Sequence, residues 1–343
     1  MHQTETIPQP LQDRDRALDW LTAASPVLLI AFFYYRWPIV GLALLAAAGY
    51  MAVYALLQWA GLTRMQAPSA LAAGVWSALL LSAHTPFWVA AIAGAVAALV
   101  AYAPDFAGRW LPNARPLLHP VLMGWLAVRL IFPTYVQTYT LPVLWAPLDA
   151  VPVSTALAPL TDPAGHDLWQ LFLGVRAGAL GTGCVPVLLL AAGYLLIRRR
   201  LRLIAPAAMV TTVSVLSWMV WNAPLHGLLA GSVLAAALLL ADRACAPAAY
   251  GDQALCGVVA GGGTVLLRAF VGEDGGAVGV LVACLLSPLY PPLVRVCRRG
   301  AVWMWGVICR FVPPAAAWVW THIRALVGKI FAFLREKICK KQK

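Results

Sequence analysis

Two arginines lie within or directly beside long apolar segments of the sequence. Arg129 falls near the end of one apolar segment, and Arg176 falls just before the next. A guanidinium in an apolar environment must reach the surface, pair with an acid or bind an anion. The sequence leaves two interpretations open for both arginines: a side chain that extends to the surface, or a contact to a bound anion such as a phosphate.

A group of hydroxyl side chains lies between these two arginines. Residues 134–175 contain no lysine or arginine and are rich in proline, threonine and aromatic residues. Within them Ser154 and Thr155 follow Asp149 in a run of small residues. A hydroxyl oxygen can accept a covalent group through a phosphoester. The spacing alone does not distinguish Thr155 from its neighbours.

No enzyme motif stands out elsewhere. The sequence has no Walker loop, no GxGxxG between a strand and a helix, and no HExxH. None of its seven cysteines forms a CxxC pair, and most lie in apolar runs, which predicts small buried side chains. His119, at the start of an apolar segment, is expected to cap or pack rather than to bind a metal.

Composition places the chain in a membrane. Of its 343 residues 62% are hydrophobic and only 11% are charged, whereas soluble domains have about a quarter charged residues. The net charge of +12 arises from short basic clusters between apolar segments and in the last 50 residues. Such placement is typical of topology signals and of contact with anionic membrane lipid, and it excludes nucleic acid as a partner. The first 19 residues are polar, so no signal peptide is expected.

About ten apolar segments can be traced, each near the length that crosses a bilayer. They are residues 22–35, 38–59, 68–83, 86–103, 117–132, 178–197, 203–221, 224–241, 253–271 and 276–294.

The positive-inside rule orients these segments. With the N-terminus inside, the inner connections carry most of the arginines, namely Arg64, Arg109, Arg115, Arg198, Arg199, Arg200, Arg202, Arg243, Arg295, Arg298 and Arg299. The long connection without lysine or arginine then faces the outside. The sequence therefore predicts a multi-pass protein of the bacterial inner membrane with both termini in the cytoplasm.

Five parts follow from this topology. They are a polar cytoplasmic N-terminus (1–19), a first transmembrane half (20–133), an outer loop (134–177), a second transmembrane half (178–295) and a basic cytoplasmic tail (296–343). Residues 315–339 of the tail are expected to form a basic amphipathic helix on the inner surface.

A weak internal similarity relates the two halves. Residues 71–81 resemble residues 228–238, with Gly74 aligned to Gly231 and Ala78 to Ala235. The matched segments are the third and the eighth, and an odd offset gives the halves opposite orientations. The expected fold is therefore all-α, with about ten transmembrane helices in two inverted five-helix halves.

Several stretches resemble the RnfD/NqrB family, which comprises the RnfD protein of the Rnf electron-transport complex and its relative NqrB of the sodium-pumping NADH:quinone reductase. Residues 114–133 are similar to that family's fifth span, at His119, Pro120, Gly124 and Phe132-Pro133. Further matches are Asp242 and Pro247, and then Arg268, Phe270 and Gly272. The resemblance covers roughly residues 20–295.

The resemblance gives the outer loop a role. The family carries the motif D-x-x-S-G-A-T-x-L, whose threonine holds FMN through a phosphoester. Without gaps, Asp149 aligns with its acid, Thr155 with its threonine and Leu157 with its leucine. The resemblance thus implies covalent FMN on Thr155, with Ser154 and Asp149 beside it and Arg129 and Arg176 available to its phosphate. It also implies a flavin transferase, other Rnf subunits as partners, and a second flavin, riboflavin, between the spans.

This sequence departs from the family pattern in three places, one of which lies near Ser287, where the family has an asparagine in span ten. Pro152, Val153 and Ser154 stand where the motif has Ser, Gly and Ala, and a second register would place Ala158 at the acceptor position. Cys184 replaces a glutamate before the sixth span. Two functions follow as hypotheses: an Rnf-type flavoprotein subunit that contributes to redox-driven Na⁺ or H⁺ translocation, or a urea-transporter-like facilitator of a small solute that has lost redox function.

Overall fold

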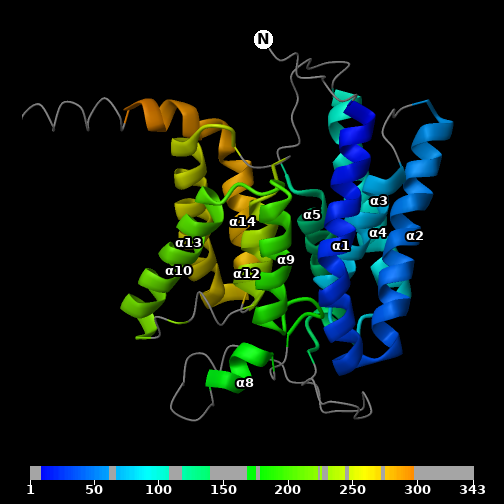
Figure 1. Cartoon of the computed structure of the whole chain (residues 1–343), viewed down its shortest axis with the longest axis horizontal. Coiled ribbons are helices and arrows are strands. Elements are labelled where there is room, and N and C mark those ends of the chain that lie inside the picture. The colour runs from blue at the N-terminus through cyan, green and yellow to red at the C-terminus, as the bar shows by residue number, and fades with distance from the viewer. Residues whose placement is uncertain are drawn as a thin grey trace, which may run out of the picture. The chain divides into compact units, whose positions relative to one another are not determined.

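A computed structural model of the chain describes residues 9–61, 67–107, 118–139, 168–174, 178–222, 225, 231–243, 247–271 and 275–296. These residues are mostly helical, and no strand occurs among them (Figure 1). The helices are α1 (Gln9–Tyr35), α2 (Trp37–Trp59), α3 (Ala67–Leu79), α4 (Phe87–Ala107), α5 (Pro120–Ile131), α6 (Pro133–Val136), α8 (Leu168–Leu173), α9 (Val185–Ile197), α10 (Ile204–Trp221), α12 (Gly231–Leu240), α13 (Tyr250–Val271), α14 (Gly275–Leu285) and the 3-10 helix η3 (Ser287–Leu289).

Three of the described helical segments are long and apolar enough to cross a membrane: Asp15–Tyr35, Trp37–Trp59 and Ile204–Trp221. A fourth candidate is the bent pair Gly275–Leu285 and Ser287–Val296. Side chains on α10 face outward with large apolar surfaces, including Met219 at 76% exposed. Such exposure suits lipid rather than water. The chain is thus a multi-pass membrane protein, and the full set of ten spans stays a prediction.

Two expected spans are shorter than the sequence pattern predicted. The third ends as a helix at Leu79 and continues without helical structure to Pro86, and the sixth becomes helical only at Val185. The reason is a direct pairing of the two non-helical stretches. The backbone N–H of Leu180 donates to the carbonyl of Leu81 at 2.9 Å, and that of Gly181 donates to the carbonyl of Leu79 at 2.7 Å. These bonds satisfy peptide groups that apolar surroundings would otherwise leave unpaired.

The packing partners recur in the same order in the two parts of the chain. In the first part α2 packs on α3 and α4, α4 packs on α5, and α3 contacts α1 and α5. In the second part α10 packs on α12 and α13, α13 packs on α14, and α12 contacts α9 and α14. The two sets meet where α1 contacts α9 and α5 contacts α14.

Glycines allow the closest of these helix contacts. A Cβ added to Gly94 of α4 would lie 1.9 Å from the carbonyl oxygen of Ala46 in α2. The corresponding contact in the second set is between Gly257 of α13 and the carbonyl oxygen of Ala205 in α10, at 2.2 Å from the built Cβ. Backbones can approach this closely only without a side chain, as in other membrane helix pairs.

The polar residues before Trp20 are part of α1, which is helical from Gln9. Asp19 lies in this helix and is 3% exposed. At the other end of the chain, residues 291–296 are helical and belong to a separate compact unit, Pro291–Lys343. The predicted amphipathic helix of the tail lies outside the described residues.

Candidate functional site

The predicted flavin acceptor lies in a part of the chain that the structure does not describe. Thr155, Ser154, Asp149 and Arg176 all fall in residues 140–167 or 175–177, outside the described ranges. The structure does describe both flanks of this segment. The chain enters it directly after Tyr139 and leaves it at α8, whose end is joined to α1 by the Tyr34 hydroxyl, which donates to the Leu173 carbonyl at 3.4 Å.

Arg129 is the one predicted site residue that the structure describes. It lies in the last turn of α5, and its Nε and Nη1 atoms are shielded from solvent. The side chain therefore does not extend fully to the surface.

Three segments that connect the longer helices meet at the end of the bundle where α5 finishes, and one of them contains the short helix α6. They are residues 80–86, 132–139 and 178–184, here called the loop end, and they contain no lysine, arginine, aspartate or glutamate. Besides the pairing of Leu180 with Leu81, the Ser82 hydroxyl donates to the backbone carbonyl of Thr138. These bonds fix the point from which residues 140–167 depart.

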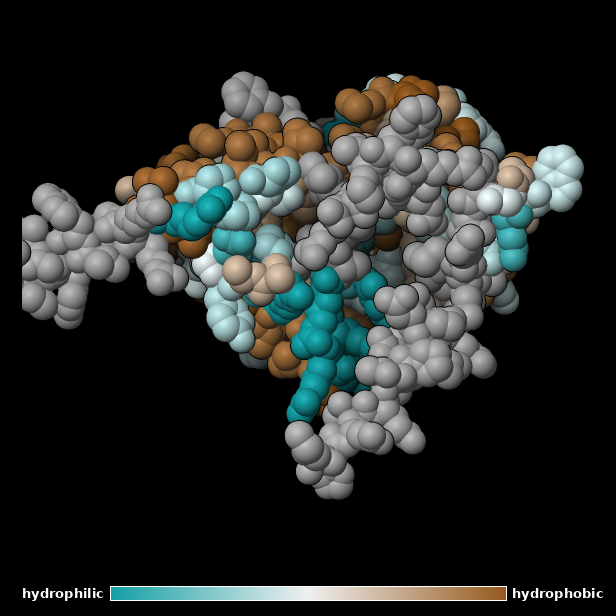
Figure 2. All heavy atoms as spheres, turned by 90° about the horizontal axis from the view of Figure 1, so that it is seen from above, coloured by the Kyte–Doolittle hydropathy of each residue, from teal (hydrophilic) through white to brown (hydrophobic). Residues whose placement is uncertain are grey.

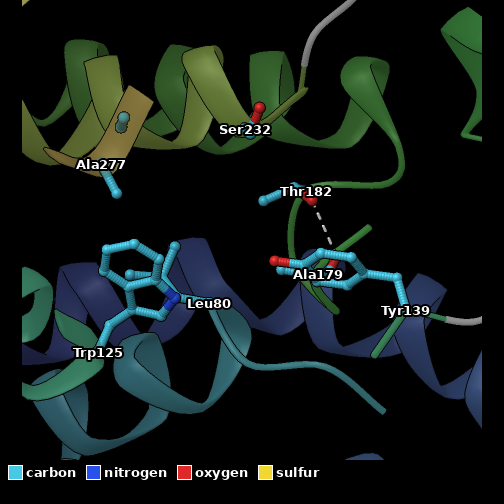
Figure 3. A pocket seen from close by; sticks show the side chains of 8 residues that line it. Leu80, Trp125, Tyr139, Ala179, Thr182, Ser232 and Ala277 are labelled. Atoms are coloured by element: carbon cyan, nitrogen blue, oxygen red, sulfur yellow. Dashed lines mark hydrogen bonds between the residues drawn. The ribbon is translucent and has the colours of Figure 1, made fainter. Parts of the chain in front are cut away.

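A small cavity lies at this end between the two helix sets. Leu80 and Trp125 line one side, and Ser232 and Ala277 line the other, with Tyr139 and Thr182 between them (Figure 3). The Thr182 hydroxyl donates to the carbonyl of Ala179 at 2.9 Å. The cavity has a volume of about 20 Å³, which is room for a single water molecule.

The opposite end of the bundle holds a network of ion pairs, here called the arginine end. Asp19 of α1 accepts hydrogen bonds from Arg198 Nε at 2.8 Å and from Arg200 Nε at 2.5 Å. The Tyr194 hydroxyl donates to the same carboxylate at 3.2 Å. The bond to Asp19 raises the pKa of the Arg198 guanidinium above its ordinary value, so this arginine stays charged.

A second ion pair joins the same two helix sets. Arg16 Nη2 lies 2.6 Å from both carboxylate oxygens of Asp242, which follows α12. Asp242 forms an antiparallel bridge with Leu201, and Arg202 donates to the carbonyl of Pro247. The carboxylates of Asp19 and Asp242 are thus each held by an arginine from the other half of the chain. Figure 2, seen from above, shows strongly hydrophilic residues gathered beside apolar surface.

Sequence reasoning missed this network. It placed Arg198, Arg200 and Arg202 on the inner side as topology signals, whereas the structure pairs two of them with a buried acid. The available signal was a carboxylate in the first helix, Asp19, at the same predicted membrane face as the arginine run. Its partners are separated from it by 179 and 181 positions, so no local pattern could have shown the contact.

Cysteine and histidine give no metal site among the described residues, where no group of three or more His, Cys, Asp or Glu side chains could hold an ion. Cys256 and Cys284 are buried and free, as predicted, and Cys184 is free and partly buried. His119 directly precedes α5, makes no side-chain capping bond and is 4% exposed. His119 is therefore a buried residue at the start of α5 whose side chain does not cap the helix.

Apolar helices, close glycine contacts and ion pairs at one end of the described bundle together define a multi-pass helical membrane protein. Within that class, the family model of the NQR2, RnfD, RnfE family matches residues 10–300. The chain belongs to this family of membrane subunits of Rnf- and Nqr-type electron-transport complexes. The comparison with individual curated proteins found no match.

Proposed function

We propose that this chain is the flavin-carrying membrane subunit of an Rnf-type electron-transport complex, with FMN bound covalently to Thr155. Family membership over residues 10–300 is the observation that carries the proposal. The ungapped agreement of Asp149, Thr155 and Leu157 with the family's flavin motif supports the attachment residue. Other subunits of such a complex are the expected partners.

The ester joins Thr155 Oγ1 to the phosphorus of FMN. A flavin donor activated at its phosphate, used by a separate transferase, supplies the leaving group, and the hydroxyl proton goes to solvent. Once attached, FMN accepts or donates one or two electrons and can join two-electron donors to one-electron centres. The tether keeps the cofactor at the loop end, and Arg129 and Arg176 are proposed to lie near its phosphate.

The arrangement of the two helix sets supports an inverted repeat of five spans each. Helix partners recur with the same order, and the ion-paired arginines Arg16, Arg198 and Arg200 lie at one end of the described bundle. We infer that the arginine end faces the cytoplasm and that the loop end, with the Thr155 segment, faces outward. Redox-driven movement of Na⁺ or H⁺ would then belong to the assembled complex.

The small cavity beside Trp125 and Ser232 is not the site of a second flavin. Its volume of about 20 Å³ is far below the roughly 300 Å³ at which small-molecule pockets begin. Riboflavin between the spans therefore stays a prediction that would need another site. The same cavity gives no support to the alternative function, a facilitator with a path for urea or a similar solute.

In-gel fluorescence tests the attachment. The full chain is produced together with a competent flavin transferase and run on a denaturing gel under ultraviolet light. We expect a fluorescent band for the wild type and for Ser154→Ala, and a dark band for Thr155→Val. A dark wild-type band would contradict the proposal and favour the solute facilitator. Fluorescence that persists in Thr155→Val would move the ester to another hydroxyl.

A further inference from the structure

Arg199 adopts a backbone conformation that favours glycine. Its φ is +56°, in the left-handed region that L-residues with a side chain seldom enter. The position is the first after the cap of α9. Its N–H donates to the Leu196 carbonyl at 2.8 Å, and the N–H of Arg200 donates to the Leu195 carbonyl at 2.9 Å. This pair of bonds is the Schellman motif, in which glycine is the usual residue.

The two arginines beside it have structural partners, and Arg199 projects to the surface. Arg198 and Arg200 turn to Asp19, whereas the side chain of Arg199 is exposed. Fold stability alone would therefore favour glycine at this position. The arginine is explained if its charge serves a contact outside the chain.

A second exposed arginine lies on the adjacent loop. Arg243 follows Asp242, and the two loops are joined by the bridge from Leu201 to Asp242 and by a hydrogen bond from Arg202 N–H to the Ala241 carbonyl at 2.9 Å. On the two adjoining loops, residues 198–203 and 241–243, arginines outnumber carboxylates. The arginines are Arg198, Arg199, Arg200, Arg202 and Arg243, and the carboxylate is Asp242, while α1 adds the pairing residues Arg16 and Asp19. Positive charge is left over after the ion pairs are formed.

Apolar neighbours set the depth of this loop in the membrane. Ile197 is 82% exposed and Leu203 is 50% exposed, on either side of the arginine run. Such side chains are stable where lipid tails cover them. The arginines between them then lie at the level of the lipid headgroups. Guanidinium groups bind phosphate well because their donors match its oxygens.

We propose that the surface formed by Arg198, Arg199 and Arg243 is a binding site for the phosphate headgroup of an anionic phospholipid. The flanking apolar residues favour a lipid over an acidic protein surface. Arg199 provides an exposed guanidinium, and the pairs with Asp19 hold the loop in place before the lipid arrives.

Native mass spectrometry of the full chain in detergent tests the proposal, with phosphatidylglycerol and phosphatidylcholine as probes. Wild-type protein should bind phosphatidylglycerol more tightly than phosphatidylcholine. Arg199→Gly should weaken the phosphatidylglycerol affinity about five-fold and leave the phosphatidylcholine affinity unchanged, since one basic residue near an anionic surface contributes that much. Its thermal midpoint should not fall, because glycine suits the Schellman position.

Arg36→Gly is the matched control. Arg36 also has a positive φ, +59°, but it joins α1 to α2 at the other end of those helices. If phosphatidylglycerol affinity fell equally in both variants, the effect would come from net charge, and the proposed binding site would be wrong. An unchanged phosphatidylglycerol affinity in Arg199→Gly would overturn it too. If that variant also failed to copurify with other subunits, the surface would be a protein contact instead.

Discussion

At the arginine end, charged side chains connect the two helix sets, whereas at the loop end backbone hydrogen bonds connect them. The first connection depends on a few residues far apart in sequence: Arg16 with Asp242, and Asp19 with Arg198 and Arg200. The second depends on glycine and on peptide groups, as in the pairing of Leu180 and Gly181 with residues 79–81.

The difference has a physical consequence. An ion pair between partly exposed groups weakens with salt and fails when one partner is lost. A backbone pairing does not depend on salt, and it tolerates most side-chain changes except those that fill the space of a glycine. The loop end is thus suited to hold a fixed frame around the segment that carries Thr155. The arginine end is suited to respond to charge, including that of lipid.

The largest effect is expected from loss of the Asp19 carboxylate. Asp19→Asn leaves Arg198 and Arg200 without their shared acceptor at a buried position, so the free energy of unfolding should fall by about 3 kcal/mol. Thermal unfolding in detergent measures the loss. An unchanged midpoint would mean that these ion pairs do not hold the helix sets together.

Gly181→Val probes the loop end with a comparable disruption. A Cβ at Gly181 would lie 2.7 Å from the Cβ of Leu79, so the paired segments must move apart at a cost of about 2 kcal/mol. The loss should be the same at low and at high salt, in contrast to the loss of the more exposed pair of Arg16 with Asp242. Gly193, whose added Cβ meets nothing within 4 Å, is the matched control, and Gly193→Val should cost much less than Gly181→Val.

Asp242→Asn removes the second ion pair. Arg16 is one-third exposed, so water replaces part of the lost contact and the cost should be about 1–2 kcal/mol. A double-mutant cycle with Arg16→Gln separates the pair from the single changes. If the losses of unfolding free energy were additive, Arg16 and Asp242 would have no coupling energy despite their short distance.

Ser82→Ala gives the smallest loss of the series. It removes the hydroxyl that donates to the Thr138 carbonyl and should cost about 1 kcal/mol, the usual contribution of one hydrogen bond. Hydrogen exchange of residues 132–139 offers a local measurement. We expect faster exchange in residues 132–139 and no change in α1. If exchange in residues 132–139 did not change relative to α1, the Ser82 hydrogen bond would not hold this segment.

Sequence reasoning reached the class and the family because both rest on features spread along the chain. Low charge and apolar segments define the membrane class, and motif positions such as His119, Pro120 and Gly124 carry the family resemblance. The ends of the third and sixth spans were wrong, at Leu79 and Val185. An apolar run does not reveal where the backbone leaves the helix and pairs with another segment.

The candidate site was harder to predict from the sequence than the fold was. The Asp19 contacts come from residues more than half the chain apart, and only the folded chain brings them together. Thr155 is the reverse case, since family resemblance selects it while the described part of the structure fixes only the flanks of its segment, at Tyr139 and at α8. The test of that residue is therefore chemical.

Peptide mapping tests the central claim most directly. Trypsin cuts after Arg129 and Arg176 and after no residue between them, so residues 130–176 form one peptide. In protein made with the flavin transferase, this peptide should carry the mass of one FMN less one water, with the added mass on fragments that contain Thr155. An unmodified peptide, or a flavin on fragments that lack Thr155, would contradict the account.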